Sequence, residues 1–376
     1  MGTGAGGRVE TISAHTLTVS DKTRWIIVRV VLDDGSAGHG EATDFGRNDV
    51  VLGTLRELGE TLVGTAVSQI FAALANYGAN RPAARVACSG IEQAVLDASA
   101  RSIGTSIAAL LGGSRRSRVP VYANINRGVD DRSPSSMAAA AGRAVDQGYR
   151  AIKIAPFDEV RPDQSRIGDI EPGIARIFAV RSAIGSDTHL RVDCHLRLTP
   201  QTAEAICATI DGVDIDWIED VLDPGTYPAD VRRALRGRFN DQGIRVAGGE
   251  DLWTIAEAAD LLSAEGLDVL LPDLRQTGVR DGLVILELAS ALGISASLHS
   301  PVSPILDGIS LQVGAAASDF FTLERQVNES PLYAELADAA SLDAEGWLTV
   351  PDGCGPLPRM GVLQQAFEVV HRVSAP

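Results

Sequence analysis

Lysine is almost missing from this 376-residue sequence. Lys22 and Lys153 are its only lysines, although it contains 33 basic residues in all. This bias indicates that arginine occupies most positions where any cation suffices, so a lysine that remains marks a position where a compact ammonium group matters. Lys153 is therefore a candidate functional residue.

Positive charge, paired cysteines and long apolar runs are also scarce. The net charge of −16 opposes binding to nucleic acid or to anionic membranes, and an anionic substrate would need a local cation. Four scattered cysteines without C-x-x-C spacing favour reduced thiols over disulfides or a zinc site. No apolar run approaches the roughly 18 residues that cross a bilayer, and no signal peptide is recognisable, so we expect a cytoplasmic protein.

Residues 1–118 are predicted to form an α+β domain. An alternating apolar run from Thr18 to Val31 precedes the turn Asp33-Asp34-Gly35, which is typical of a β-hairpin. Helical periodicity then dominates from about residue 48 to residue 111. We expect residues 345–376 to pack back on this domain, because they show strand and helix character without a further repeat of the pattern that precedes them.

Residues 119–344 alternate between short β-rich runs and amphipathic helices that open with Ser, Thr or Pro and close with Gly. Eight successive strand–helix units predict a closed parallel barrel rather than an open doubly wound sheet. The predicted strands are residues 119–123, 151–154, 190–193, 215–219, 244–247, 269–271, 295–298 and 320–323.

Polar side chains recur at the C-terminal ends of these strands, where a parallel barrel builds its active site. Three of them, Asp193, Glu219 and Glu250, follow consecutive strands. A lone acid at a strand end more often caps a helix or pairs with a base, but three converging carboxylates cannot all stay ionised without a cation. Oxygen ligands favour Mg²⁺, with open positions for a substrate carboxylate. The sequence therefore predicts a magnesium site.

The next strand ends carry Asp273, His299 and Glu324. Asp273 and His299 lie on neighbouring strands, so the carboxylate can orient the imidazole and raise its basicity. Glu324 has two open roles, as a protonated hydrogen-bond donor or as a charge partner of Arg325. A cation, a carboxylate site and an Asp-oriented histidine together predict removal of the proton α to a carboxylate, through an enediolate.

The same residues resemble the enolase superfamily, specifically its mandelate racemase subgroup, from about residue 8 to residue 365. The resemblance implies a (β/α)7β-type TIM barrel with an N-terminal α+β capping domain, Mg²⁺ as cofactor, a small-molecule carboxylate as substrate, and a homo-oligomer. It rests on the acidic triad, the His299/Asp273 dyad and Glu324, together with Gly38-His39-Gly40-Glu41-Ala42, Ser89-Gly90-Ile91-Glu92-Gln93-Ala94 and Leu111-Gly112-Gly113.

Two positions indicate which reaction of the family to expect. The family's usual strand-two motif is K-x-K, but here Lys153-Ile154-Ala155 ends in a residue that cannot move a proton, which disfavours a two-base racemase. Lys153 then becomes an electrostatic partner of the substrate carboxylate or of the metal ligands, or else a structural ion pair.

Asp193-Cys194-His195 resembles the D-x-H motif of sugar-acid dehydratases such as galactonate dehydratases, in which the histidine protonates a departing hydroxyl. Strand alternation predicts that Asp193 and His195 point into the site and Cys194 away from it. The alternative is that His195 is a surface residue beyond the strand end.

We therefore predict a Mg²⁺-dependent dehydratase of an aldonic or aldaric acid, in which the His299/Asp273 dyad removes the α-proton and His195 protonates the β-hydroxyl. The enol product tautomerises to a 2-keto-3-deoxy acid. The alternatives are an isomerase, racemase or cycloisomerase that shares the enediolate, and a non-catalytic protein that binds sugar acids. Candidate substrate-binding residues, which otherwise organise loops, are Asn124, Asn126, Arg127 and Arg275.

Overall fold

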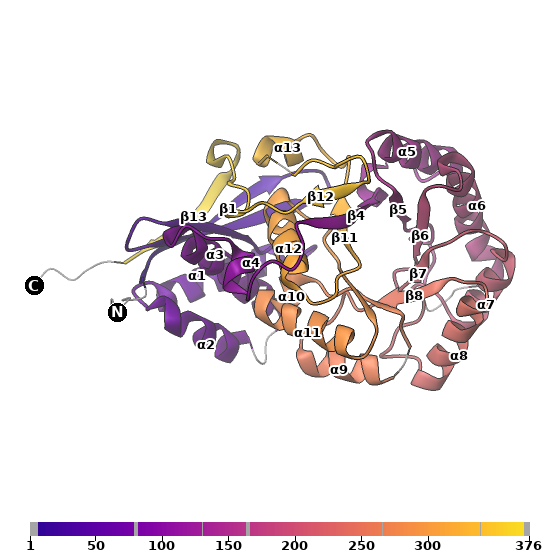
Figure 1. The fold of residues 1–376 in the computed structure, drawn as a ribbon, viewed down its shortest axis with the longest axis horizontal. Coiled ribbons are helices and arrows are strands. Elements are labelled where there is room, and N and C mark those ends of the chain that lie inside the picture. The colour runs from indigo at the N-terminus through magenta and orange to yellow at the C-terminus, as the bar shows by residue number, and fades with distance from the viewer. Residues whose placement is uncertain are drawn as a thin grey trace, which may run out of the picture.

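The computed structural model describes residues 7–78, 82–129, 131–162, 166–264, 266–338 and 340–371. Figure 1 shows an N-terminal capping domain, in indigo, beside a barrel whose colours run from magenta to orange. Within the described ranges, every helix is too short or too polar to cross a lipid bilayer.

Eight parallel strands in the described residues form a closed barrel, as predicted. Each strand pairs with the next in chain order, and the last pairs with the first to complete the ring. Compared with the predicted ranges, the fourth strand starts later and the eighth both starts and ends later. The strands are β4 (Arg118–Asn124), β5 (Ala151–Ile154), β6 (His189–Asp193), β7 (Trp217–Glu219), β8 (Arg245–Gly248), β9 (Val269–Leu270), β10 (Ser295–Leu298) and β11 (Thr322–Gln326).

Helices surround this barrel and bury their apolar faces against it. Several start with the Ser or Thr caps that the sequence indicates: Ser133, Thr199, Thr254 and Ser303 each accept a hydrogen bond from a backbone N–H in the first turn. The helices are α5 (Pro134–Asp146), α6 (Ile167–Ile184), α7 (Pro200–Thr209), α8 (Ala229–Asn240), α9 (Ile255–Ser263), α10 (Leu274–Thr277), α11 (Val279–Ala291) and α12 (Pro304–Ala316).

The capping domain is an antiparallel sheet packed on helices. Its strand order is β13-β1-β2-β3, and α3 lies against β3. Gly38 and Gly40 permit this packing, because a Cβ atom on Gly38 would lie 2.1 Å from the backbone nitrogen of Ala98 in α3. The elements are β1 (Val9–Thr18), β2 (Arg24–Leu32), β3 (Ala37–Glu41), α1 (Asn48–Leu62), α2 (Val67–Gly78), α3 (Pro82–Ser102) and α4 (Ile107–Leu110).

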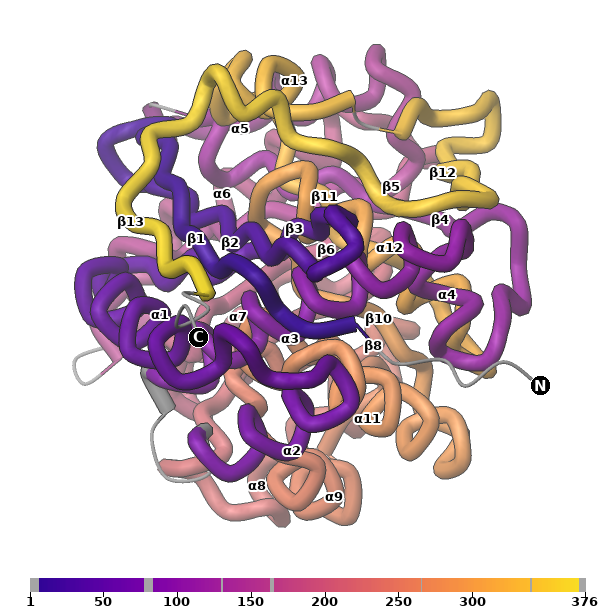
Figure 2. Tube along the Cα trace, turned by 90° about the vertical axis from the view of Figure 1, so that its left-hand side faces the viewer, coloured from indigo at the N-terminus to yellow at the C-terminus, as the bar shows by residue number. Residues whose placement is uncertain are grey.

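The C-terminal segment contacts both parts of the molecule. After α13 (Leu332–Leu336), β12 (Trp347–Thr349) pairs with β4 of the barrel, and β13 (Gln364–Val370) pairs with β1 of the capping domain. Figure 2 shows this segment in yellow, running from β12 across to β13 beside β1. The segment therefore joins the first barrel strand to the N-terminal sheet.

An aromatic layer closes the barrel below the C-terminal strand ends. Arg191 of β6 lies within the barrel, with its guanidinium carbon 3.8 Å from the ring centre of Trp217 and 4.4 Å from that of Tyr122. Asp216 balances this charge at 2.9 Å. The indole N–H of Trp217 donates to Glu219 Oε2 at 3.0 Å. The floor of the barrel thus holds one of the predicted metal ligands directly.

Candidate active site

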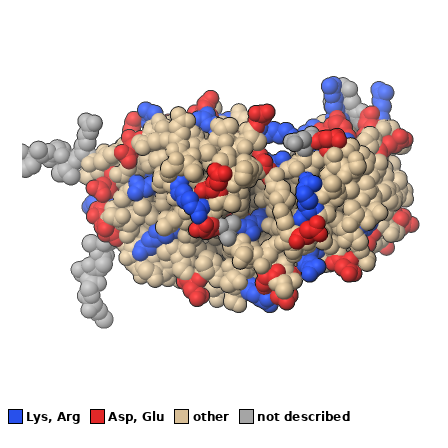
Figure 3. Space-filling view, turned by 90° about the horizontal axis from the view of Figure 1, so that it is seen from above, with Lys and Arg blue, Asp and Glu red and all other residues tan. Residues whose placement is uncertain are grey.

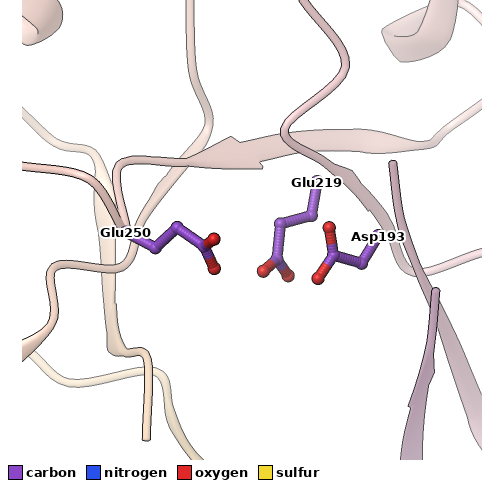
Figure 4. Close-up of side chains that lie close together, drawn as sticks. All are labelled: Asp193, Glu219 and Glu250. Carbon is purple, nitrogen blue, oxygen red and sulfur yellow. The ribbon is translucent and has the colours of Figure 1, made fainter. Parts of the chain in front are cut away.

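Three carboxylates meet at the mouth of the barrel, as Figure 4 shows. Asp193 ends β6, Glu219 ends β7, and Glu250 lies two residues beyond β8; one oxygen from each falls within 4.8 Å of the others. Asp193 Oδ2 and Glu250 Oε2 are buried and accept no well-directed hydrogen bond in the described part of the chain, although the Nε2 atoms of His195 and His299 lie 3.1 Å and 2.9 Å from them. Converging, desolvated carboxylates with unsatisfied oxygens fit a hard divalent cation.

Lys153 lies under this triad and is fully buried. Its Nζ atom is 2.6 Å from Glu219, 3.2 Å from Glu324 and 3.4 Å from Asp193. Burial opposes the charged form, but Glu219 and Glu324 outweigh it and hold the pKa of Lys153 well above its usual value. The retained lysine is therefore an ammonium group in contact with two of the predicted metal ligands.

His299, one residue beyond β10, forms the predicted pair with Asp273. Its Nδ1 atom is 2.8 Å from Asp273 Oδ2, and its Nε2 atom is 2.9 Å from Glu250 Oε2. Although burial alone would lower the pKa of His299, Glu250 and Glu324 raise it well above the usual value. Asp273 thus fixes the orientation of the ring, and Nε2 faces the carboxylate cluster.

Arg275 points inward, but its contacts differ from those of a free substrate-binding residue. Its Nε atom donates to both oxygens of Asp273 at 3.0 Å, and its Nη1 atom donates to the carbonyl of Thr43 in the capping domain. Most of its donors are thus committed to Asp273 and to the capping domain. Arg275 still lines the cavity, so a direct role in substrate binding stays a prediction.

His195 contacts the triad from the wall opposite His299, as predicted for an inward-pointing residue. Its position does not result from strand alternation, however, because His195 lies beyond the end of the strand. The strand ends at Asp193, and His195 has a positive φ of 46°. Its Nε2 atom nevertheless lies 3.1 Å from Asp193, while Nδ1 lies 2.6 Å from Asp158. Asp193, opposed by burial and helped by Asp158, raises the pKa of His195 to about 12. Cys194 is buried in the apolar core, as expected.

Glu324 faces the barrel interior, where it acts as an acceptor 3.2 Å from Lys153 Nζ, and its predicted role as a protonated donor stays a prediction. Its Oε1 atom accepts from Asn124 and its Oε2 atom accepts from the Ser300 amide at 3.0 Å. Arg325 lies instead 3.2 Å from Asp307. The structure therefore shows no charge pairing between Glu324 and Arg325, and Glu324 belongs to the site.

Asn124 and Asn126 build the wall that follows β4. Asn124 Oδ1 accepts from the Asn126 amide, and Asn126 Oδ1 accepts from the Ala155 amide at 2.6 Å. The side-chain nitrogen of Asn126 is buried without a hydrogen-bond partner in the described residues. Asn126 thus both organises the loop and retains a free donor at the cavity.

These groups surround a cavity of about 450 Å³ between the barrel mouth and the capping domain. Sequence reasoning missed several of its lining residues because they lie on loops. The scarcity of lysine is the one signal that could have found Lys22. The missed residues on loops include Lys22, Thr43, Phe45, Arg132, Asp158, Asp251 and Trp253. On the face drawn in Figure 3, acidic and basic side chains are interspersed without a broad basic surface.

Comparison with known proteins agrees with this geometry. Residues 9–112 match the mandelate racemase / muconate lactonizing enzyme N-terminal domain, and residues 136–356 match the enolase C-terminal domain-like family. The chain is 26% identical to D-xylonate dehydratase of Haloferax volcanii, over 92% of this chain and 85% of that protein. It is also 26% identical to D-galactonate dehydratase of Ralstonia nicotianae, over 94% and 92%.

A similar fold occurs in a protein described as an L-alanine-DL-glutamate epimerase of Burkholderia xenovorans strain LB400, solved with magnesium and fumarate bound. It is 22% identical, has a TM-score of 0.83, and covers 94% of this chain and 95% of that one. The two matched domain families together cover most of the sequence. This chain therefore belongs to the enolase superfamily, in its mandelate racemase / muconate lactonizing enzyme subgroup.

Proposed function

We propose that this chain is a Mg²⁺-dependent dehydratase of sugar acids. One observation carries the proposal: two histidines, each held by a carboxylate, lie on opposite walls of one barrel mouth with the acidic triad between them. His299 follows β10 and His195 follows β6, four strands apart in a closed ring of eight. A base and an acid placed in this way can serve neighbouring carbons of one substrate.

The cation is the part of this proposal that the chain does not itself supply. Asp193, Glu219 and Glu250 would hold it, and a bound Mg²⁺ supplies Lewis-acid stabilisation of the charge that develops on a substrate carboxylate. The sugar-acid dehydratases named above support this choice of substrate, and the epimerase solved with magnesium supports the choice of ion.

The residues then divide the proton transfers. His299 Nε2 takes the α-proton while Asp273 holds Nδ1. A cation held by Glu250 would offset the charge that raises the pKa of His299, which would favour the neutral, basic form of the ring. Lys153 stabilises the negative charge of the carboxylate cluster beneath the substrate. His195 Nε2 protonates the departing β-hydroxyl, with Asp158 orienting the imidazole. The enol formed on loss of water tautomerises to a 2-keto-3-deoxy acid.

A library of aldonic and aldaric acids, incubated with the Mg²⁺-loaded protein, tests the proposal through semicarbazide detection of 2-keto acids. We expect His299→Asn to abolish both solvent deuterium exchange at Cα and keto-acid formation. His195→Asn should keep exchange and lose keto-acid formation. His189, exposed at the other end of β6, provides the matched control, and His189→Asn should keep both activities.

Two outcomes would replace this function with another. Deuterium at Cα without any keto acid from the wild-type protein would indicate an isomerase, and no reaction despite measurable binding would indicate a non-catalytic sugar-acid binding protein. Ala155 weighs against a two-base isomerase, because its side chain cannot return a proton. Cytoplasmic location and homo-oligomer formation stay predictions.

A further inference from the structure

Positive charge without a carboxylate partner lines the side of the cavity that is remote from the metal ligands. Arg127 lies in the short 3₁₀ turn after β4, and its guanidinium is half-buried. Its Nη1 atom donates to Thr23 Oγ1 at 2.8 Å, and its carbon lies 3.8 Å from the ring centre of Phe45. Within the described residues, no carboxylate oxygen lies within 4.0 Å of it.

The other arginines at this cavity, unlike Arg127, each have a carboxylate partner. Arg132 lies 3.1 Å from Asp158, Arg47 lies 3.1 Å from Asp44, and Arg275 is held by Asp273. Burial lowers the pKa of Arg127, with Glu329 opposing that effect from farther away. A half-buried guanidinium without a counter-ion is costly, so an anionic ligand that reaches it is stabilised.

Lys22 adds a second cation from the capping domain. It lies in the turn between β1 and β2, is exposed, and lines the same cavity. The turn is anchored on one side by Thr23, which accepts from Arg127, and on the other by Ser20, which donates to Glu329 at 2.9 Å. Both cations therefore line one cavity, and the hydrogen bond from Arg127 to Thr23 ties the turn that carries Lys22 to the barrel.

The barrel ring places Arg127 opposite Glu250 and closer to the other two triad members. Arg127 follows β4, two strands from Asp193 on β6, three from Glu219 on β7 and four from Glu250 after β8. Asn126, beside Arg127, contributes a side-chain nitrogen that is buried without a partner in the described residues. A substrate whose first carboxylate meets the triad thus extends its far end toward Arg127.

We propose that Arg127 and Lys22 bind a second carboxylate, at the end of the substrate away from the triad, and that the substrates are aldaric acids rather than aldonic acids. This inference rests on the proposed function. The planar guanidinium fork matches a carboxylate in two parallel hydrogen bonds, and the lysine supplies a mobile point charge.

Binding of two unreactive acids tests the subsite without requiring turnover. Adipate and hexanoate have the same chain length, and adipate alone carries a second carboxylate. With Mg²⁺ present, titration calorimetry should show adipate binding at least about tenfold more tightly than hexanoate, as expected for a charge-assisted contact. Equal binding of the two acids would overturn the proposal.

Three variants identify the residues that cause the preference for adipate over hexanoate. Arg127→Gln should reduce the ratio of the two affinities to about threefold or less while leaving the hexanoate affinity unchanged. Lys22→Met should reduce this ratio by a few-fold. Arg24→Gln removes a capping-domain cation that pairs with Asp49 and does not line the cavity, so it should leave the preference intact. Equal weakening of both acids by Arg127→Gln would show that Arg127 does not read the second carboxylate. Since Lys22 is exposed, its variant tests the subsite even if Arg127→Gln does not fold.

Turnover of glucarate, gluconate and 6-phosphogluconate separates this inference from the function on which it rests. A kcat/KM for glucarate at least tenfold above that for gluconate supports both the dehydratase function and the aldaric-acid specificity. Gluconate used as well as glucarate would keep the dehydratase and overturn the aldaric assignment, and preference for 6-phosphogluconate would assign the subsite to phosphate instead. If no acid of the wider library reacts either, the dehydratase fails, while the adipate and hexanoate comparison still decides the subsite.

Discussion

Replacement of Lys153 by methionine tests whether electrostatics organise the site. The ammonium group is fully buried and lies within 3.4 Å of three carboxylates, those of Asp193, Glu219 and Glu324. Methionine keeps most of the volume, so little of the effect comes from packing. Removal of one member of a buried ionic cluster leaves uncompensated charge and costs about 3–5 kcal/mol, a large part of the roughly 5–15 kcal/mol by which most proteins are stable.

Urea unfolding followed by circular dichroism measures this loss, first in chelator and then in excess Mg²⁺. We expect the full loss in chelator and a smaller one in Mg²⁺, because a cation held by Asp193 and Glu219 replaces part of the missing charge. Lys22→Met, at the only other lysine, is the matched control and should change stability by less than about 0.5 kcal/mol, since Lys22 is exposed.

A companion variant separates charge from shape. Lys153→Met combined with Glu324→Gln removes one negative charge as well, and it should regain part of the stability lost by the single substitution. A loss of less than about 1 kcal/mol for Lys153→Met in chelator, or an equal loss with and without Mg²⁺, would refute the reasoning that the lysine and the cation share one acidic cluster.

Three further predictions concern the metal, the domain interface and the packing. Mg²⁺ added to chelator-treated protein should raise the thermal unfolding temperature, by mass action, and Glu219→Gln should remove the increase; an unchanged midpoint in the wild type would argue against the site. Glu92 of α3 accepts from the Arg280 amide at the start of α11, and burial raises its pKa from 4.5 to about 7. The folded state therefore holds a proton at Glu92 that the unfolded state releases, so the contribution of Glu92 to wild-type stability should fall as pH rises from 4.5 to 7. Glu92→Gln should remove up to roughly 3 kcal/mol of that fall, measured by urea unfolding at pH 4.5 and pH 8, and parallel pH profiles would contradict this. Gly173→Ala should cost about 1–3 kcal/mol, because a Cβ atom there would lie 2.2 Å from the Phe157 ring, whereas Gly142→Ala, in open space, should stabilise α5 by up to about 1 kcal/mol; equal unfolding midpoints for the two variants would contradict the packing argument.

The barrel and its acidic triad were predictable because both follow from periodic features. Short β-rich runs alternating with helices define eight strands, and a parallel ring brings their C-terminal ends to one mouth. Asp193 and Glu219 lie at the last positions of their strands, so their placement needs only the strand boundaries. The composition also singled out Lys153, since the chain retains only two lysines.

Residues beyond the strand ends were less predictable, because loop conformation and domain docking decide their positions. His195 and Leu196 both adopt positive φ values, which alternation along a strand cannot anticipate. Asp158 contacts His195 from a loop 37 residues earlier. Lys22 and Phe45 reach the cavity only because the capping domain packs over the barrel mouth. Periodicity carries no information about any of these contacts.

The contacts of Ala155 explain how the site accommodates an alanine where the family's usual K-x-K motif has its second lysine. Ala155 occupies that position, and its backbone is fully used: the amide donates to Asn126 Oδ1, and the carbonyl accepts from Arg132. Arg132 in turn pairs with Asp158, the carboxylate that holds His195. The second strand therefore supplies a scaffold for the wall that carries the proposed acid, in place of a base of its own. A proton donor just after β6 that faces a base just after β10 suits removal of water from adjacent carbons, and Ala155 supplies no second base on strand two.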